Sequence, residues 1–318
     1  MSTLQRQLAL PFAATKPGPG RPGGQSIERR GGVEFVEMTC RSILNWVQGS
    51  RASDFYSVNP YRGCEHACAY CYARYTHEFL GQPGNEDFER RVYVKTNAPE
   101  VLARDLRRSR VFEHGISFGS ATDPYQPAER RFRLTRSLLE KLLPFRGLSV
   151  SIVTKAALVE RDVDLLAELA GRHELAVLFS CIGLDPVLQR ALEPRACPPE
   201  RRFEAMARLS AAGVRCELLV APIMPGLNDA EADLVRLCRR AREAGAVMVF
   251  GQALFLLEAT RRRFFPWLAE HRPDLADGYR RAFGRGRELD RNYRIKVSDR
   301  LTRVADAAGL GDGRRTVR

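Results

Sequence analysis

Three cysteines within eight residues form the pattern in this sequence that points most directly to chemistry. Cys64, Cys68 and Cys71 follow the spacing C-x-x-x-C-x-x-C, and the next cysteine along the chain is Cys181. Thiolates this close together are typical ligands of one metal centre. A ferredoxin-type cluster or a four-cysteine zinc site needs a fourth thiolate. The spacing therefore predicts an iron–sulfur cluster with three protein ligands, which leaves one iron open to another molecule.

The same segment also permits a zinc site with three cysteines and one histidine. His66 or His77 would then supply the fourth ligand. The remaining cysteines are Cys40, Cys181, Cys197, Cys216 and Cys238. Their scatter along the chain argues against a disulfide framework. A non-catalytic module that binds zinc or an iron–sulfur cluster thus stays open as an alternative to an enzyme.

Small and polar residues follow several apolar segments further along the chain. They occur at residues 119–123, 154–155, 180 and 222–228. If the apolar segments are parallel strands, these residues stand at their carboxyl ends, where α/β folds place their active sites. We therefore expect them to share one site with the cysteine segment.

The elements that would position these residues alternate along the chain. Strands are predicted at residues 56–61, 116–119, 148–154, 175–182, 214–223 and 247–254. Amphipathic helices are predicted at residues 99–108, 134–143, 161–169 and 231–244, and in a stretch that ends at residue 212. Such alternation indicates parallel βαβ units and an α/β fold. Six units are too few for a closed eight-stranded barrel, so they form either an open doubly wound sheet or an incomplete barrel.

The two ends of the chain differ from this central part. Residues 1–30 contain a short apolar stretch interrupted by Pro11 and then a Pro/Gly-rich segment, which predicts a disordered tail and no secretory signal. Residues 31–258 are expected to form the catalytic unit, and residues 259–318 a basic region. No apolar run reaches 18 residues, so we expect a cytoplasmic protein without a membrane-spanning helix.

The charge balance favours a polyanionic partner. The chain has 51 Lys and Arg against 38 Asp and Glu, a formal charge of +13, and residues 259–318 hold 16 basic and 8 acidic side chains. DNA or RNA would fit this excess, although a solvated basic surface fits it equally well. Three arginines at 261–263 precede Phe264, Phe265 and Trp267. This mixture can bind bases and phosphates, but packing of an amphipathic helix is the favoured interpretation.

Four segments resemble one known family. Residues 59–73, 122–129, 153–155 and 222–228 are similar to the radical S-adenosylmethionine (SAM) superfamily, in the DNA-repair-photolyase-like subgroup related to spore photoproduct lyase. The resemblance runs from about residue 59 to residue 254. It implies a partial (β/α)6 TIM-like barrel. The basic C-terminal region lies outside the resemblance and is expected to be helical. The resemblance also implies a 4Fe–4S cluster on Cys64, Cys68 and Cys71, with SAM on the open iron.

The resemblance further implies a reaction. The reduced cluster cleaves SAM to methionine and a 5′-deoxyadenosyl radical, which abstracts a hydrogen atom from a substrate. The electron would come from a donor such as flavodoxin or ferredoxin. The substrate is either nucleic acid or, as the alternative, a protein or small metabolite.

Six further residues are expected to bind SAM: Tyr70, Ser120, Thr122, Lys155, Ser180 and Ile223. By resemblance Tyr70 lies beside the adenine and Lys155 pairs with the SAM carboxylate. Ser120 or Thr122 would contact the methionyl amine, because the glutamate of the family's Gly-Glu motif is absent. Ser180 suits the methionine or ribose, and Ile223 the adenine.

The sequence differs from the subgroup in the cysteine that would donate a hydrogen atom during the radical reaction. Spore photoproduct lyase uses a cysteine downstream of its cluster, whereas this chain has no cysteine between Cys71 and Cys181. Cys181 is the candidate donor here. Its side chain, however, should point away from that of Ser180, because side chains alternate along a strand.

Overall fold

The computed structural model describes residues 24–48, 54–82, 87–107 and 111–312. Within these residues the largest sheet has the strand order β12-β11-β10-β9-β8-β7-β4-β3. Its strands are β3 (Asn45–Val47), β4 (Phe55–Val58), β7 (Ile116–Phe118), β8 (Ser149–Thr154), β9 (Glu174–Ser180), β10 (Arg215–Ile223), β11 (Ala246–Ala253) and β12 (Gly311–Asp312). All neighbours from β4 to β12 pair in parallel, and β3 is an antiparallel edge strand.

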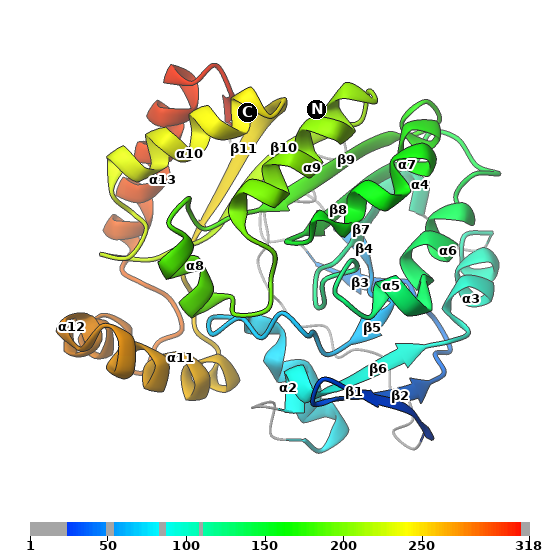
Figure 1. Ribbon diagram of the computed structural model, residues 1–318, viewed down its shortest axis with the longest axis horizontal. Helices are drawn as coiled ribbons and strands as arrows, with labels where there is room; N and C mark the ends of the chain where they lie inside the picture. The colour runs from blue at the N-terminus through cyan, green and yellow to red at the C-terminus, as the bar shows by residue number, and fades with distance from the viewer. Residues whose placement is uncertain (1–23, 49–53, 83–86, 108–110, 313–318) are drawn as a thin grey trace.

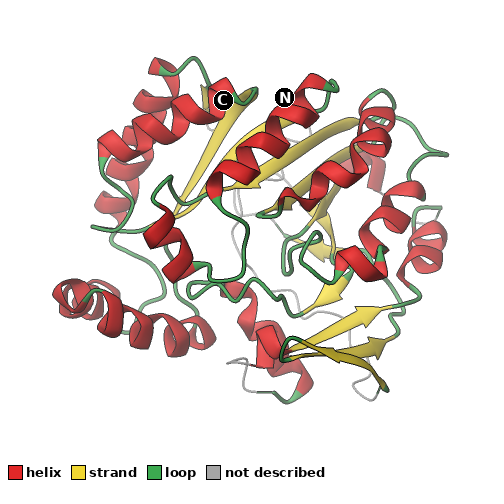
Figure 2. Cartoon of the chain, in the orientation of Figure 1, coloured by secondary structure: helices red, strands yellow, loops and turns green. Residues whose placement is uncertain are grey.

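Helices follow the strands of this sheet and cover one of its faces (Figures 1 and 2). They are α3 (Ala98–Asp105), α4 (Val111–His114), α6 (Leu134–Glu140), the 3₁₀ helix η2 (Ala157–Asp162), α7 (Val163–Ala170), α9 (Pro199–Ala211), α10 (Glu231–Glu243) and α13 (Arg291–Ala307). Two further helices, α5 (Glu129–Phe132) and α8 (Pro186–Leu192), pack instead in the apolar clusters of the small sheet and of Tyr70. Six parallel strands, β4 to β11, thus alternate with helices. The structure confirms the predicted α/β class and the arrangement of a partial (β/α)6 barrel.

Alternation along each strand separates the core from the inner face of the barrel. In β8, Val150 and Ile152 belong to the main apolar core, which also contains Val177 and Phe179 of β9. Ser149 and Ser151 are buried but are not part of that core. Because successive side chains point to opposite faces, these small polar residues face the inside of the barrel. The main apolar core therefore lies between the sheet and its helices, and the inner face combines these serines with a smaller apolar cluster that includes Leu178 and Leu219.

A second, four-stranded sheet supports the cysteine segment. Its order is β1-β2-β6-β5, with β1 (Ser26–Arg30), β2 (Val33–Met38), β5 (Tyr61–Arg62) and β6 (Arg91–Lys95). The chain leaves β5 directly into the cysteines, and η1 (Tyr72–Leu80) and α2 (Asp87–Arg90) follow them before β6. The sheet lies at the lower right of Figure 1, below the large sheet.

Part of the segment predicted as an N-terminal tail is a strand. Residues 1–23 lie outside the described residues, but Ser26–Arg30 forms strand β1, paired antiparallel with β2. Most of its residues are exposed and polar, so they show no apolar period. The strand exists because β2 supplies hydrogen bonds, and such pairing leaves no signal in the segment's own sequence.

The C-terminal region is helical, as predicted, and packs on the rest of the molecule. Helix α13 contacts α10 and β11 and so takes the place of the sixth helix of the barrel. Helices α11 (Glu258–His271) and α12 (Pro273–Phe283) lie at the lower left of Figure 1, and α11 contacts η1. Phe264 and Trp267 of α11 share an apolar cluster with Tyr70. No helix among the described residues is long and apolar enough to cross a membrane.

Candidate active site

A cavity of about 140 Å³ opens at the carboxyl ends of the barrel strands. Cys64, Cys68 and Cys71 all line it. The other lining residues that the sequence predicted are Tyr70, Ser120, Thr122, Lys155 and Ser180. Segments far apart in the chain are therefore brought to one place, as their position after parallel strands indicated.

Gly63 fixes the start of the cysteine segment. Its φ is +90°, and a Cβ there would lie 2.7 Å from the carbonyl oxygen of Arg91 and 2.8 Å from that of Phe88. The next amide, that of Cys64, donates a hydrogen bond to the Phe88 carbonyl at 3.0 Å. Both the backbone conformation and the close approach require glycine. The segment is thereby held against α2 and β6 just before its first thiolate.

Thr122 and Gln126 hold the same glycine from the other side. The Thr122 hydroxyl donates to the Gly63 carbonyl at 2.6 Å, and the Gln126 amide donates to Thr122 Oγ1 at 2.8 Å. Gln126 Oε1 also accepts from the Glu65 amide at 2.9 Å. The Thr122 hydroxyl proton is thus used within the protein. Thr122 lines the cavity, but its hydrogen bonds serve the cysteine segment.

The three thiols fit a cluster better than they fit a single ion. All are free cysteines, of which Cys64 and Cys68 are buried and Cys71 is half-buried, and desolvation raises the pKa of each thiol. Among the described residues, no group of three or more His, Cys, Asp or Glu side chains is arranged to hold one metal ion. A cubane cluster instead offers a separate iron to each thiolate, so three sulfurs around one cavity are a suitable donor set.

The two histidines of the zinc alternative have other partners. His77 contacts the Arg91 carbonyl through Nε2 at 3.1 Å. His66 lines the cavity, and its Nε2 lies 3.1 Å from Oδ2 of Asp123. A zinc site with three cysteines and one histidine therefore has no support in this geometry.

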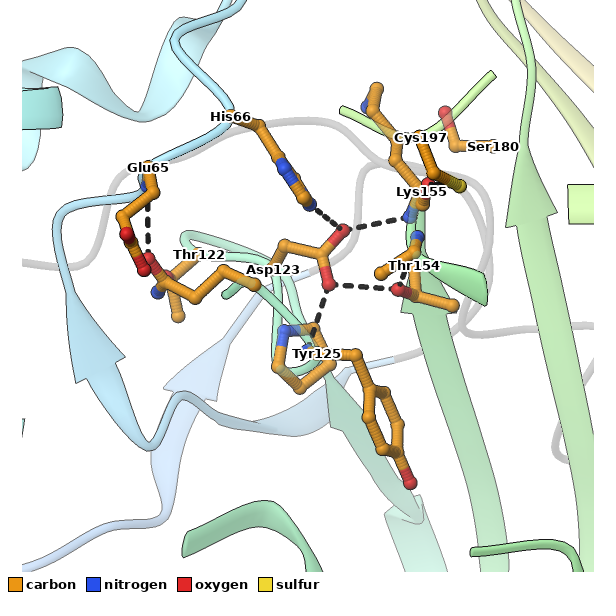
Figure 3. Close-up of polar contacts among 12 residues, drawn as sticks. Glu65, His66, Thr122, Asp123, Tyr125, Thr154, Lys155, Ser180 and Cys197 are labelled. Atoms are coloured by element: carbon orange, nitrogen blue, oxygen red, sulfur yellow. Dashed lines mark hydrogen bonds and ion pairs between the residues drawn. The ribbon is translucent and has the colours of Figure 1, made fainter. Parts of the chain in front are cut away.

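Asp123, in the loop after β7, joins the cysteine segment to the end of β8 (Figure 3). Besides His66, its carboxylate accepts from Thr154 Oγ1 at 2.7 Å, the Lys155 amide at 2.7 Å and the Tyr125 amide at 2.9 Å. Burial alone would raise the pKa of Asp123, but the His66 charge and these hydrogen bonds lower it to about 2. The His66 partner of this carboxylate lies 57 positions away in the sequence and could not be found from spacing.

Ser120 lies in a compact turn after β7. Its hydroxyl is 2.7 Å from Ser57 Oγ and accepts from the Asn59 amide group at 3.1 Å, while Asn59 Oδ1 accepts from the Ala121 amide at 2.8 Å. Gly119 has φ +91°, and a Cβ there would lie 2.4 Å from the Val153 carbonyl. The turn after β7 therefore packs closely against β8. Asn59, which sequence reasoning did not single out, fixes its position.

Lys155 brings a cation to the cavity. Its Nζ lies 5.7 Å from the centroid of the Tyr70 ring. Burial lowers the pKa of Lys155, but Cys68 and Glu193 raise it by more, so its net shift is upward. The Tyr70 hydroxyl donates to Glu193 Oε1 behind the cavity wall. The cavity thus combines an ammonium group, an aromatic face and three thiols.

Two predicted site residues lie elsewhere. Ile223 is buried in the main core and is not a lining residue, because the pairing of β10 with β11 is irregular between Val220 and Ile223. Leu219, Ala221 and Pro222 line the cavity instead. The expectation that Ile223 contacts adenine is therefore wrong.

Cys181 also faces away from the cavity. It belongs to the main core, and its thiol donates to the Gly183 carbonyl at 3.2 Å. Ser180, its neighbour, does line the cavity, so the two side chains point in opposite directions, as alternation requires. A hydrogen donor must reach the substrate, and Cys181 does not.

Comparisons with known proteins agree with this geometry. Residues 58–238 match the model of the radical SAM superfamily. An uncharacterised protein of Mycobacterium tuberculosis is 40% identical over 273 residues, which cover 85% of this chain and 79% of the relative. The radical SAM Nalpha-GlyT isomerase of Pseudomonas phage M6 is 25% identical over 247 residues, covering 71% and 49%.

The fold also has solved counterparts. A variant of spore photoproduct lyase with bound AdoMet and dinucleoside spore photoproduct matches with a TM-score of 0.66 and 17% identity, over 88% of this chain and 81% of that one. The chain belongs to the radical SAM superfamily. Members of this superfamily are enzymes that use a 4Fe–4S cluster and SAM, and the thiols, small residues and cation of the cavity suit both groups.

Proposed function

We propose that this radical SAM enzyme acts on nucleic acid, from which it abstracts a hydrogen atom in a lyase or oxidoreductase type of reaction. Cys64, Cys68 and Cys71 bind the 4Fe–4S cluster, whose remaining iron binds SAM. When bound and reduced, these cofactors supply a 5′-deoxyadenosyl radical. A small electron carrier such as flavodoxin or ferredoxin provides the electron.

The protein's own residues orient SAM and exclude water. Lys155 pairs with the SAM carboxylate, Tyr70 lies along the adenine, and Ser180 and Ser120 contact the polar parts of SAM. Thr122 contributes through the cysteine segment that it holds. Buried apolar residues such as Leu219 and Leu254 form part of the wall, which keeps water and stray hydrogen donors from a reactive species.

The observation that carries the choice of nucleic acid is a basic loop beside the cavity, residues 284–290, which we call the arginine loop. Leu256 donates its amide to the Arg287 carbonyl at 2.8 Å, and Phe255, which lines the cavity, forms a bridge with Glu288. Arg285 and Arg287 are exposed. A polyanion whose base enters the cavity would therefore pass its phosphates along these two cations.

The acidic residues of the arginine loop are already engaged. Glu288 pairs with Arg294 at 2.9 Å, and Asp290 accepts from the amides of Asn292 and Tyr293 at the start of α13. Arg261 donates to the Gly286 carbonyl at 2.6 Å and holds the loop in place. The loop has no net formal charge of its own, but Arg285 and Arg287 are its exposed cations while its two carboxylates are paired or capping a helix.

Similar proteins support the same substrate class. The spore photoproduct lyase structure contains a dinucleoside lesion, and the phage relative is named as a Nalpha-GlyT isomerase. Together with the net charge of +13, they favour nucleic acid over a protein or small metabolite.

Salt-dependent binding tests this proposal. Affinity for a short single-stranded DNA and RNA should fall steeply with salt. Replacing both Arg285 and Arg287 by Gln should weaken binding and reduce the log–log salt slope by about 0.7 for each phosphate that is no longer neutralised. The matched control replaces Arg146 and Arg239 by Gln, since both are exposed and belong to other elements, the segment before β8 and helix α10. Equally weakened binding in the two double variants would mean that only net charge matters.

A label experiment tests the hydrogen abstraction itself. Nucleic acid from cells grown in deuterated water is incubated with the reconstituted, reduced enzyme and SAM. We expect deuterium in the 5′-deoxyadenosine that forms. If the 5′-deoxyadenosine is unlabelled and forms at the same rate without nucleic acid, nucleic acid is not the substrate, and a protein or small metabolite is favoured instead.

A further inference from the structure

A fully buried ion pair stands directly behind the proposed SAM site. Glu193 follows α8 and Arg202 lies in α9, and both side chains are 0% exposed. The Arg202 Nη2 group donates to Glu193 Oε2. Neither residue lines the cavity. Burying two charges carries a large desolvation cost, and such a pair is commonly no more stabilising than apolar residues of similar volume. Stability alone therefore does not account for it.

Apart from a 3.5 Å contact of the Gln189 amide with Glu193 Oε2, the other hydrogen bonds of the pair lead directly, or through Cys197, to residues of the site. Glu193 Oε1 accepts a hydrogen bond from the hydroxyl of Tyr70, a residue that lies between the second and third cysteines in the sequence. Arg202 Nη1 donates to the Ser180 carbonyl at 2.7 Å, at the end of β9. Arg202 Nε donates to the Cys197 carbonyl at 2.9 Å, and the Cys197 thiol in turn donates to the carbonyl of Lys155 at 3.1 Å.

The backbone next to Glu193 also holds the cysteine segment. The Ala69 amide donates to the Leu192 carbonyl at 2.9 Å, and the Arg195 amide donates to the His66 carbonyl at 3.4 Å. One ion pair is thus connected to three parts of the cavity wall: the cysteine segment, the end of β9 and the segment after β8. These are the parts that carry Tyr70, Ser180 and Lys155.

We propose that Glu193 and Arg202 are positioning residues, which set the ring of Tyr70 and the backbone of Ser180 at the distance that SAM requires. The planar guanidinium can donate to several acceptors in fixed directions, and the carboxylate can accept from Arg202 and Tyr70 at once. Apolar side chains of the same volume would fill the space without fixing these directions. The proposal rests on the proposed cofactor site.

The test separates positioning from folding by changing one or both partners. R202M leaves a buried carboxylate without its counter-ion, so its urea midpoint should fall well below that of the wild type. The double variant E193L/R202M removes both charges, and its midpoint should return close to the wild-type value. The control variant R201M/E204L removes the exposed Arg201–Glu204 pair of the same helix, α9, and should change little.

The readouts are SAM affinity and the electron paramagnetic resonance spectrum of the reduced cluster with SAM. We expect E193L/R202M to bind SAM at least about tenfold more weakly and to show an altered SAM-dependent spectrum, although its stability recovers. Y70F should show part of the same weakening, since it removes only the hydroxyl that Glu193 accepts from. Y70F also decides the question if the double variant fails to fold.

Wild-type SAM affinity and spectrum in both E193L/R202M and Y70F would overturn the positioning role. That outcome differs from failure of the proposed function, in which the wild-type protein itself, with its cluster loaded, would bind no SAM.

Discussion

The residues of the cavity wall have two kinds of role: some present their side chains to the cavity, and others hold the cysteine segment in place. Lys155 and Tyr70 present their side chains to the cavity, whereas Thr122 and Asp123 use their polar atoms to tie the cysteine segment to neighbouring strand ends. Lys155 was expected at the site from its place after a strand together with the family resemblance, and Tyr70 from the resemblance alone. The second kind depends on partners tens of residues away, such as His66 for Asp123, and sequence spacing carries no record of them.

The errors at this scale have a specific cause. Simple alternation would place Ile223 on the same face as Leu219 and Ala221, which line the cavity. The irregular pairing after Val220 turns Ile223 into the core. A one-residue irregularity reverses the side of every later residue, and the signal of it within β10 is Pro222, since proline within a sheet is confined to edges and bulges.

Replacing Lys155 by Met tests the residue that we assign to the SAM carboxylate. The change removes the cation and keeps most of the apolar stem. Loss of a charge-assisted interaction of about 1.5 to 3 kcal/mol should weaken SAM binding by about 10- to 100-fold. Equilibrium SAM binding to the cluster-loaded protein measures this, with exposed Lys296→Met as the control. If both variants bound SAM as the wild type does, the carboxylate would have another partner.

At the scale of elements, the strands and helices of the barrel could be predicted from the sequence because their apolar residues recur with a strong period. The prediction of residues 148–154 and 214–223 as strands differs from β8 and β10 by one residue each. The second sheet was missed. Strand β6 has the sequence RVYVK and β1 has SIERR, and such short segments become strands only through the neighbours that pair with them.

The turn after β7 provides a test at this scale. Gly119→Ala places a Cβ 2.4 Å from the Val153 carbonyl in a residue with φ +91°. The left-handed conformation alone costs about 1 to 2 kcal/mol, and the close approach adds to it. We expect a lower free energy of unfolding in urea and weaker SAM binding. Gly278→Ala, in α12 with open space around it, should be neutral or stabilise by up to about 1 kcal/mol. Similar stability of both variants would show that the turn is not tightly constrained.

At the scale of the whole molecule, the two ends of the chain complete the site. The small sheet that contains β1 and β2 also carries β5, which leads into the cysteines. Helix α11 packs against η1 and the apolar cluster of Tyr70, and α13 closes the barrel. Composition indicated a basic C-terminal region, and the fold places its arginine loop beside the cavity. Composition alone could not place it there, because that position depends on the hydrogen bond between Leu256 and Arg287.

The central claim is that three thiolates in this cavity hold a cluster that cleaves SAM. Formation of 5′-deoxyadenosine by the anaerobically reconstituted, dithionite-reduced protein measures this directly. We predict its formation by the wild type and by Cys238→Ala, whose thiol lies in the core, and none by Cys64→Ala, Cys68→Ala or Cys71→Ala. Turnover at the wild-type rate in any of these three variants, or none in a wild type with four irons per chain, would contradict the account.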